Sequence, residues 1–90
     1  MKTHNLKTDS DVFKSVQCGD KTFEIRKDDR GFQVGDYLVL LETKYTGEQM
    51  KSEPASPMLY TGEACVRRVT HILRGPKYGL REGWVIMSVA

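Results

Sequence analysis

The strongest constraint on the fold is a strict alternation of polar and apolar side chains at residues 21–27. Phe23 and Ile25 would lie on one side of an extended chain, while Glu24 and Arg26 would lie on the other. Because successive side chains of a β-strand point to opposite faces, this period of two predicts a strand with one buried face. We expect Phe23 and Ile25 to face the core, and Glu24 and Arg26 to face the surface.

The rest of the chain predicts further short strands and one helix. Val12, Phe13 and Val16 form a narrow apolar stripe at helical spacing, and Gly19 follows at a position where a helix could end. The expected elements are strands at residues 2–6, 21–27, 37–41, 63–73 and 84–89, and a helix at residues 9–18. Short strands joined by turns that contain glycine are typical of small β-rich domains.

Taken in order, these elements predict an α+β, β-rich fold, namely a small mixed β-barrel with the N-terminal helix covering one opening. Residues 1–90 would form a single domain. The apolar positions of the strand at 63–73 do not keep one alternation, which indicates a β-bulge near Arg67 and Arg68. The segment 44–61 has no clear pattern and predicts a long loop that is either mobile or functional.

Composition narrows the class of protein. Hydrophobic residues make up 39% of the chain and charged residues 29%, a balance that fits a folded domain. Cys18 and Cys65 lie outside any CxxC or CxxH pattern, and neither His4 nor His71 has the neighbours of a metal site. We therefore expect no metal and no cofactor. Without a long apolar run or a leader-like first segment, the chain is expected to be cytoplasmic and free of membrane contact.

The charge is unevenly distributed along the chain. The formal net charge is only +2, from fourteen Lys and Arg against twelve Asp and Glu, so the total does not indicate nucleic acid. Between residues 66 and 81, however, all charged side chains are basic. They are Arg67, Arg68, Arg74, Lys77 and Arg81. A local excess of this kind can attract phosphate, although an ordinary solvated surface could have the same composition.

The segment Gly19–Arg26, GDKTFEIR, matches the pattern GxKxxExR, the signature of ASCH (activating signal cointegrator homology) domains. The preceding helix, a turn at Val34–Asp36 and a closing strand at Trp84–Met87 agree with the order of elements in that family. The whole chain resembles a compact ASCH-type family of bacteria and their phages. This resemblance implies a PUA-like β-barrel with a cleft between barrel and helix, in which RNA is bound.

One bacterial branch that is similar to this chain around the motif acts as an amidohydrolase on acetylated cytidine. The resemblance to that branch implies Lys21 as catalytic base, with Thr22 and Glu24 as the other functional groups. In that branch a threonine stands three positions after the lysine, and a more distant glutamate completes the site. Here Glu24 occupies the threonine position, and the distant glutamate has no counterpart. We therefore expect binding rather than hydrolysis.

For binding, Arg26 can hold a phosphate in its fork, Lys21 can pair with phosphate, and Glu24 can accept from a base amino group. Tyr78 could offer a stacking face to an unpaired base. The residues expected to contact RNA or a nucleotide-like ligand are Lys21, Thr22, Glu24, Arg26, Arg67, Arg68, Lys77 and Tyr78. Two other interpretations stay open: Glu24 and Arg26 form an ordinary surface ion pair, or the segment 44–61 docks a protein.

Overall fold

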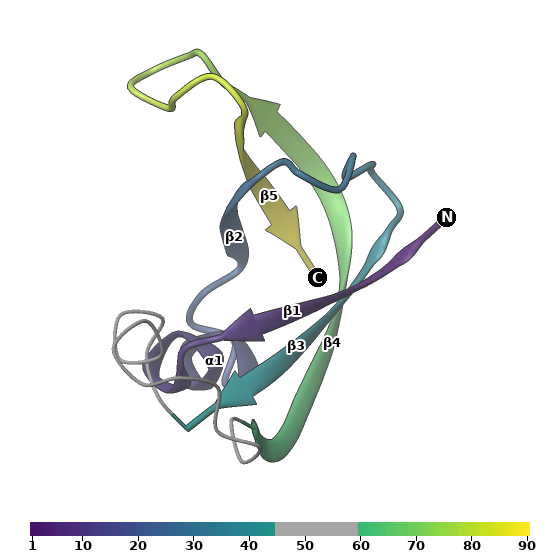
Figure 1. Cartoon of the computed structure of the whole chain (residues 1–90), viewed down its shortest axis with the longest axis vertical. Helices are drawn as coiled ribbons and strands as arrows, with labels where there is room; N and C mark the ends of the chain where they lie inside the picture. The colour runs from purple at the N-terminus through teal and green to yellow at the C-terminus, as the bar shows by residue number, and fades with distance from the viewer. Residues whose placement is uncertain (45–59) are drawn as a thin grey trace.

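The computed structural model of the chain describes residues 1–44 and 60–90. Within these ranges the chain forms β1 (Thr3–Thr8), α1 (Ser10–Gln17), β2 (Phe23–Lys27), β3 (Tyr37–Thr43), β4 (Tyr60–Arg74) and β5 (Trp84–Val89). The expected order of a strand, a helix and four further strands is confirmed for the described ranges (Figure 1). Residues 45–59, on which the expected long loop and its possible role in docking a protein fall, lie outside the described residues.

The strands form one five-stranded sheet in the order β1–β3–β4–β5–β2. β1 runs parallel to β3, whereas the other neighbouring pairs are antiparallel. β4 pairs with β3 through its first half and with β5 through its second half, and it runs along the whole height of the bent sheet (Figure 1). With one short helix in the described ranges, the α+β, β-rich class is confirmed.

The sheet does not close into a complete barrel. β1 and β2 stand at opposite ends of the strand order and share no ladder. Two arginine side chains span the gap instead: Arg26 of β2 donates to the carbonyl oxygen of Lys7, and Arg30 donates to that of Asn5, both on β1. The expected barrel is therefore open along this line, which we call the β1–β2 seam.

The core lies between α1 and the inner face of the sheet. α1 packs against β3 and β4 through the stripe that its sequence predicts, with Phe13 and Val16 buried. Gly19 follows the helix with φ of +89°, a left-handed conformation that favours glycine, and it turns the chain toward β2. The buried apolar residues are Leu6, Phe13, Val16, Phe32, Leu38, Leu40, Cys65, Val69, Val85, Met87 and Val89.

The predicted orientation of β2 is wrong, because the strand forms but buries its other face. Phe23 is 40% exposed and Ile25 is 48% exposed, whereas Glu24 is only 2% exposed. Glu24 lies opposite Met87 of β5, which belongs to the core. Alternation shows that two faces of a strand differ, but it does not show which face meets the core. Here β5 supplies the apolar interior, and neighbouring cations compensate the carboxylate of Glu24.

The predicted bulge in β4 lies slightly further along the chain than expected. Arg67 and Arg68 keep a regular register with β3. The register shifts instead between Val69 and His71, where β4 passes from its β3 partner to its β5 partner. The shift leaves Val69 fully buried and His71 exposed. A bulge therefore does explain the irregular spacing of apolar residues, but it lies after Arg68 rather than at Arg67 and Arg68.

Candidate nucleic-acid interface

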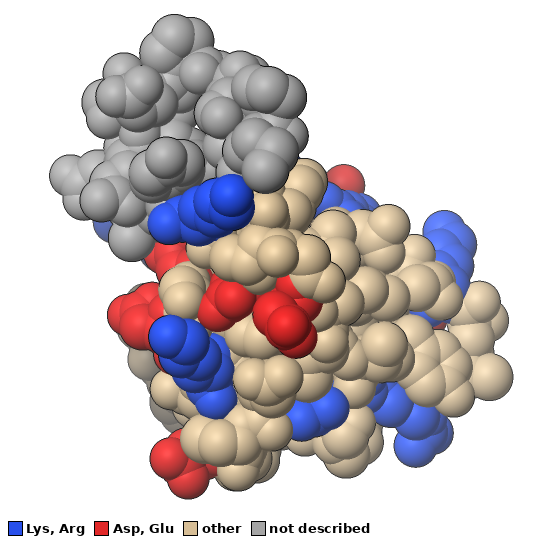
Figure 2. Space-filling model, turned by 90° about the horizontal axis from the view of Figure 1, so that it is seen from below, with Lys and Arg blue, Asp and Glu red and all other residues tan. Residues whose placement is uncertain are grey.

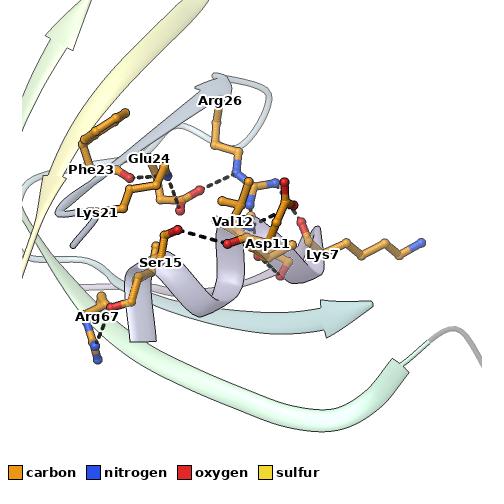
Figure 3. Close-up of polar contacts among 12 residues, drawn as sticks. Lys7, Asp11, Val12, Ser15, Lys21, Phe23, Glu24, Arg26 and Arg67 are labelled. Carbon is orange, nitrogen blue, oxygen red and sulfur yellow. Dashed lines mark hydrogen bonds and ion pairs between the residues drawn. The ribbon is translucent and has the colours of Figure 1, made fainter. Parts of the chain in front are cut away.

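A cleft of about 290 Å³ opens at the β1–β2 seam, beside the beginning of α1. Its walls come from the end of β1, the start of the helix, and β2 with the turn before it. The lining residues are Lys7, Thr8, Asp9, Val12, Lys21, Glu24, Ile25 and Arg26. The structure thus brings three charged residues of the GxKxxExR motif, Lys21, Glu24 and Arg26, into one cleft (Figure 3).

Glu24 is the centre of this charged group. Its side chain is 3% exposed, and Oε1 lies 3.0 Å from Nζ of Lys21 while Oε2 lies 3.2 Å from Nε of Arg26. Figure 3 shows the two basic side chains converging on the carboxylate from opposite sides. A buried charge is strongly disfavoured unless it is paired and hydrogen-bonded, and both oxygens of Glu24 are satisfied here. The surface ion pair considered in the sequence is therefore one half of a triad, in which two partly exposed cations hold a buried carboxylate.

The turn between α1 and β2 places Lys21. Its backbone N–H donates to the carbonyl oxygen of Ser15 at 2.9 Å, which ties the residue to the last turn of the helix. Its ammonium group donates both to Glu24 and to the carbonyl oxygen of Phe23, and it lies 4.7 Å from the centre of the Phe23 ring. Lys21 is thus held by a carboxylate, a carbonyl and an aromatic face, while 20% of its side chain stays exposed.

Arg26 connects the triad to the opposite side of the seam. Besides Glu24, its guanidinium contacts the carbonyl oxygen of Lys7 at 3.0 Å and Oγ1 of Thr8 at 3.3 Å. Arg30 makes the corresponding contact one step along, 2.7 Å from the carbonyl oxygen of Asn5. The planar fork of arginine suits several acceptors at once, so Arg26 both fixes Glu24 and joins β2 to β1.

Two further depressions extend the cleft. One of about 330 Å³ shares Ile25 and Arg26 with the first and continues along the seam to Trp84. Its remaining lining residues are Leu6, Lys27, Asp29, Arg30 and Phe32. A third depression of about 280 Å³ shares Trp84 with the second and is completed by Gly79, Leu80 and Arg81. Neighbouring depressions share residues, so they adjoin one another in a row from Lys21 to the hairpin between β4 and β5, and we call this row the path.

Thr22 does not belong to this site. Its side chain is exposed and absent from the cleft lining, and its carbonyl oxygen accepts from the backbone N–H of Val89. The hydroxyl group in the cleft comes instead from Thr8, which is 2% exposed and contacts Arg26. The set Lys21, Thr22 and Glu24 is therefore not brought together. The sequence around Thr8 does not indicate that this residue lines the cleft, because its position there depends on β1 lying opposite β2.

The basic residues of β4 serve other parts of the fold. Arg67 donates to the carbonyl oxygen of Val16 at 3.1 Å, which caps the C-terminal end of α1, and Figure 3 shows it pointing away from Glu24. Arg68 is exposed on a different stretch of the sheet and lines none of the three depressions. Arg74 lies 2.6 Å from Asp28 and also donates to a backbone carbonyl, so it anchors the turn after β2.

Lys77 and Tyr78 lie in the hairpin between β4 and β5, which Figure 1 shows projecting from the end of the molecule opposite α1. Tyr78 is 93% exposed and has φ of +49°, which is uncommon for a residue other than glycine.

Because its members lie on different parts of the molecule, the predicted basic stretch does not form one patch. Figure 2 shows acidic side chains between basic ones on the face seen from below, so charge of one sign does not dominate that face.

The described residues contain no group of three or more His, Cys, Asp or Glu that could hold a metal ion. His4, whose place in the first expected strand could have put it beside the motif groove, is buried against Asp36 and Phe32 and does not line the cleft. None of the helices in the described ranges is long and apolar enough to span a bilayer.

The fold and the cleft define a class of protein: a small α+β domain whose open, bent sheet carries a cationic cleft built around a buried carboxylate. The family model described as "Domain of unknown function (DUF3850)" matches residues 3–89. The chain therefore belongs to the DUF3850 family. No curated protein matches the chain.

Proposed function

We propose that this protein binds single-stranded RNA along the path of depressions that begins at the β1–β2 seam. The observation that carries the proposal is the buried Glu24 holding Lys21 and Arg26 at the mouth of the cleft. Charged groups held in this way lose little further freedom when they bind, which favours affinity for a charged ligand. Phosphate is the anion that best matches an ammonium and a guanidinium group set side by side.

The continuation of the cleft supports a chain-like ligand rather than a single small anion. Lys27, Arg30 and Arg81 follow Lys21 and Arg26 along the path, and Trp84 joins the second depression to the third. Basic groups that follow a backbone, together with aromatic faces for stacking, are the usual features of single-strand binding sites. The resemblance to ASCH domains favours RNA over DNA as the ligand.

In this proposal Glu24 does not read a base. Both of its carboxylate oxygens are occupied, and its side chain is 3% exposed. Its role is to position the two cations. The predicted contact between Glu24 and a base amino group would require one of these ion pairs to break, which is costly in a buried site.

The alternative function, amidohydrolysis of an acetylated cytidine, receives less support from the geometry. The resemblance implied Lys21, Thr22 and Glu24 acting together, whereas Thr22 lies outside the cleft and Nζ of Lys21 is already engaged by Glu24 and by the Phe23 carbonyl. We expect no release of cytidine from acetylcytidine, measured by chromatography next to the Lys21→Ala variant. Turnover that disappears in that variant would assign the cleft to hydrolysis.

The decisive experiment is a charge reversal on the cleft rim that leaves the triad intact. Lys7→Glu changes an exposed residue of β1 that lines the cleft, and Lys2→Glu makes the same change just before the strand, away from the depressions. Binding of a fluorescently labelled ten-nucleotide RNA would be measured by anisotropy. We expect Lys7→Glu to weaken binding about tenfold, or about 1.4 kcal/mol, and Lys2→Glu to change it little. Equal effects of the two variants would contradict the proposed location.

A further inference from the structure

The outer face of the β2–β5 half of the sheet carries several apolar side chains that are exposed to solvent. The strand registers align its residues in rows across β4, β5 and β2. The first row holds His71, Ser88 and Phe23, the second holds Leu73, Ile86 and Ile25, and the third holds Trp84 and Lys27. We call these eight side chains the outer face. On β5 the intervening residues Val85 and Met87 belong to the core.

Three large apolar side chains of the outer face are exposed to solvent. Phe23 is 40% exposed, Ile25 is 48% exposed and Trp84 is 36% exposed. They belong to two paired strands, so they form a contiguous surface rather than scattered exposures. A contiguous apolar surface on a small protein usually marks an interaction site. The inverted orientation of β2 is the direct cause, because it places Phe23 and Ile25 outside.

The charges on the outer face select the kind of partner. None of its eight residues is acidic, and Lys27 lies in the row of Trp84. At the other end, the ammonium of Lys21 lies over the ring of Phe23. An apolar protein surface covering this face would bury Lys27 without a counter-charge, which is unfavourable. A single-stranded nucleic acid supplies both flat bases for the apolar side chains and phosphates for the lysines.

The outer face is also continuous with the seam. Ile25 lines the first and second depressions, and Trp84 lines the second and third. Trp84 pairs with Lys27, which lies four residues after Phe23 on β2. At the rise of a strand, this places the two aromatic rows about 13 Å apart. A strand of RNA whose phosphates follow the seam could therefore reach the two aromatic rings as separate stacking positions.

From these observations we infer that the outer face of β2 and β5 stacks unpaired bases, with Trp84 and Phe23 as the two aromatic positions. The inference rests on the proposed RNA-binding function and deepens it, because it makes the ligand a single strand with accessible bases. A duplex keeps its bases paired and stacked on one another, so it would lose this part of the interaction.

Trp84 provides a direct test because it is the only tryptophan of the chain. Its emission would be followed while a ten-nucleotide oligouridylate is added, and again with an abasic oligomer of equal length. We expect quenching by the oligouridylate, and little change with the abasic strand, which keeps phosphates but lacks bases. Binding of both strands would be measured in parallel by competition with a labelled RNA.

Variants separate stacking from folding. Trp84→Ala should weaken binding of oligouridylate about tenfold, while Trp84→Phe should retain most of the affinity. Tyr37→Ala is the matched control, because Tyr37 is an aromatic residue of similar exposure, 40%, on β3 and outside all three depressions. Circular dichroism would confirm that each variant is folded.

The possible failures can be told apart. In one outcome, RNA binds with the expected dependence on Lys7 while Trp84→Ala keeps the full affinity and the emission of Trp84 does not change on binding. In that case the stacking inference falls and the seam proposal stands. If no RNA binds at all, both fall. If Trp84 emission changes with protein concentration alone, and sedimentation shows a dimer, the outer face pairs with a second copy and the stacking inference is overturned.

Discussion

Nε2 of His4 lies 2.9 Å from Oδ2 of Asp36, and both side chains are buried. Asp36 also accepts from the backbone N–H groups of Lys2 and Gln33, each at 3.0 Å. The bond from Lys2, followed by that from His4, lowers the pKa of Asp36 to about 2. One carboxylate therefore joins the start of β1 to the turn that precedes β3.

The first prediction concerns this carboxylate. Because its folded pKa is lowered, Asp36 stabilises the fold above the unfolded value of about 3.9, and this contribution is lost as pH falls toward 2. Asp36→Asn should reduce the free energy of unfolding by about 1–3 kcal/mol at pH 7, and by less near pH 3. Urea denaturation at both pH values would measure this. Asp29→Asn, at an exposed residue of the same turn region, should have little effect.

The second prediction concerns the beginning of α1. Oγ of Ser10 and Oγ1 of Thr61 each donate to the buried Glu42 at 2.8 Å, and these bonds, that of Ser10 first, lower the pKa of the carboxyl group. Ser10→Ala should raise that pKa and lower the melting temperature at neutral pH, with a smaller loss in acid, where Glu42 is protonated. Ser15→Ala is the control, because the hydroxyl that this change removes donates to Asp11 within the same helix. Equal losses for the two variants at both pH values would refute the proposed link.

The third prediction concerns the seam. The orientation predicted from the sequence implied that Arg26→Ala would leave the fold intact, but Arg26 contacts Glu24, Lys7 and Thr8. Arg26→Lys keeps the charge and loses the fork, so it should reduce stability by roughly 1–2 kcal/mol. Arg68→Lys is the matched exposed control. Chemical denaturation of both variants would decide the matter, and an unaffected Arg26→Lys protein would show that the bridge to β1 is dispensable.

The fourth prediction concerns salt. If Lys7, Lys21, Lys27 and Arg81 contact four phosphates, the logarithm of affinity should fall with the logarithm of salt concentration with a slope of about −2.8. Removing one contact by Lys7→Glu should make the slope shallower by about 0.7. Anisotropy titrations at several salt concentrations would give both slopes. A flat response would point to an uncharged ligand.

Local sequence patterns were sufficient to predict the elements but not their surroundings. Alternation located β2 and helical spacing located α1, because both depend on neighbours a few residues away. The buried face of β2 was predicted wrongly, since it depends on what β5 presents to the interior. Of the four motif residues expected to converge, Lys21, Glu24 and Arg26 line one cleft and Thr22 does not. The place of Thr8 in the cleft and the bond from Arg30 to Asn5 depend on contacts between distant segments, which no local pattern records.

The arginine bridges across the seam also occupy backbone acceptors on an outer strand of the sheet. An outer strand of a sheet offers unpaired carbonyl groups to which a strand of another molecule can add. On β1, the carbonyl oxygens of Asn5 and Lys7 are already occupied by Arg30 and Arg26. The same two guanidinium groups that hold the open sheet together therefore deny neighbouring chains a template for edge-to-edge growth, and their loss would favour aggregation.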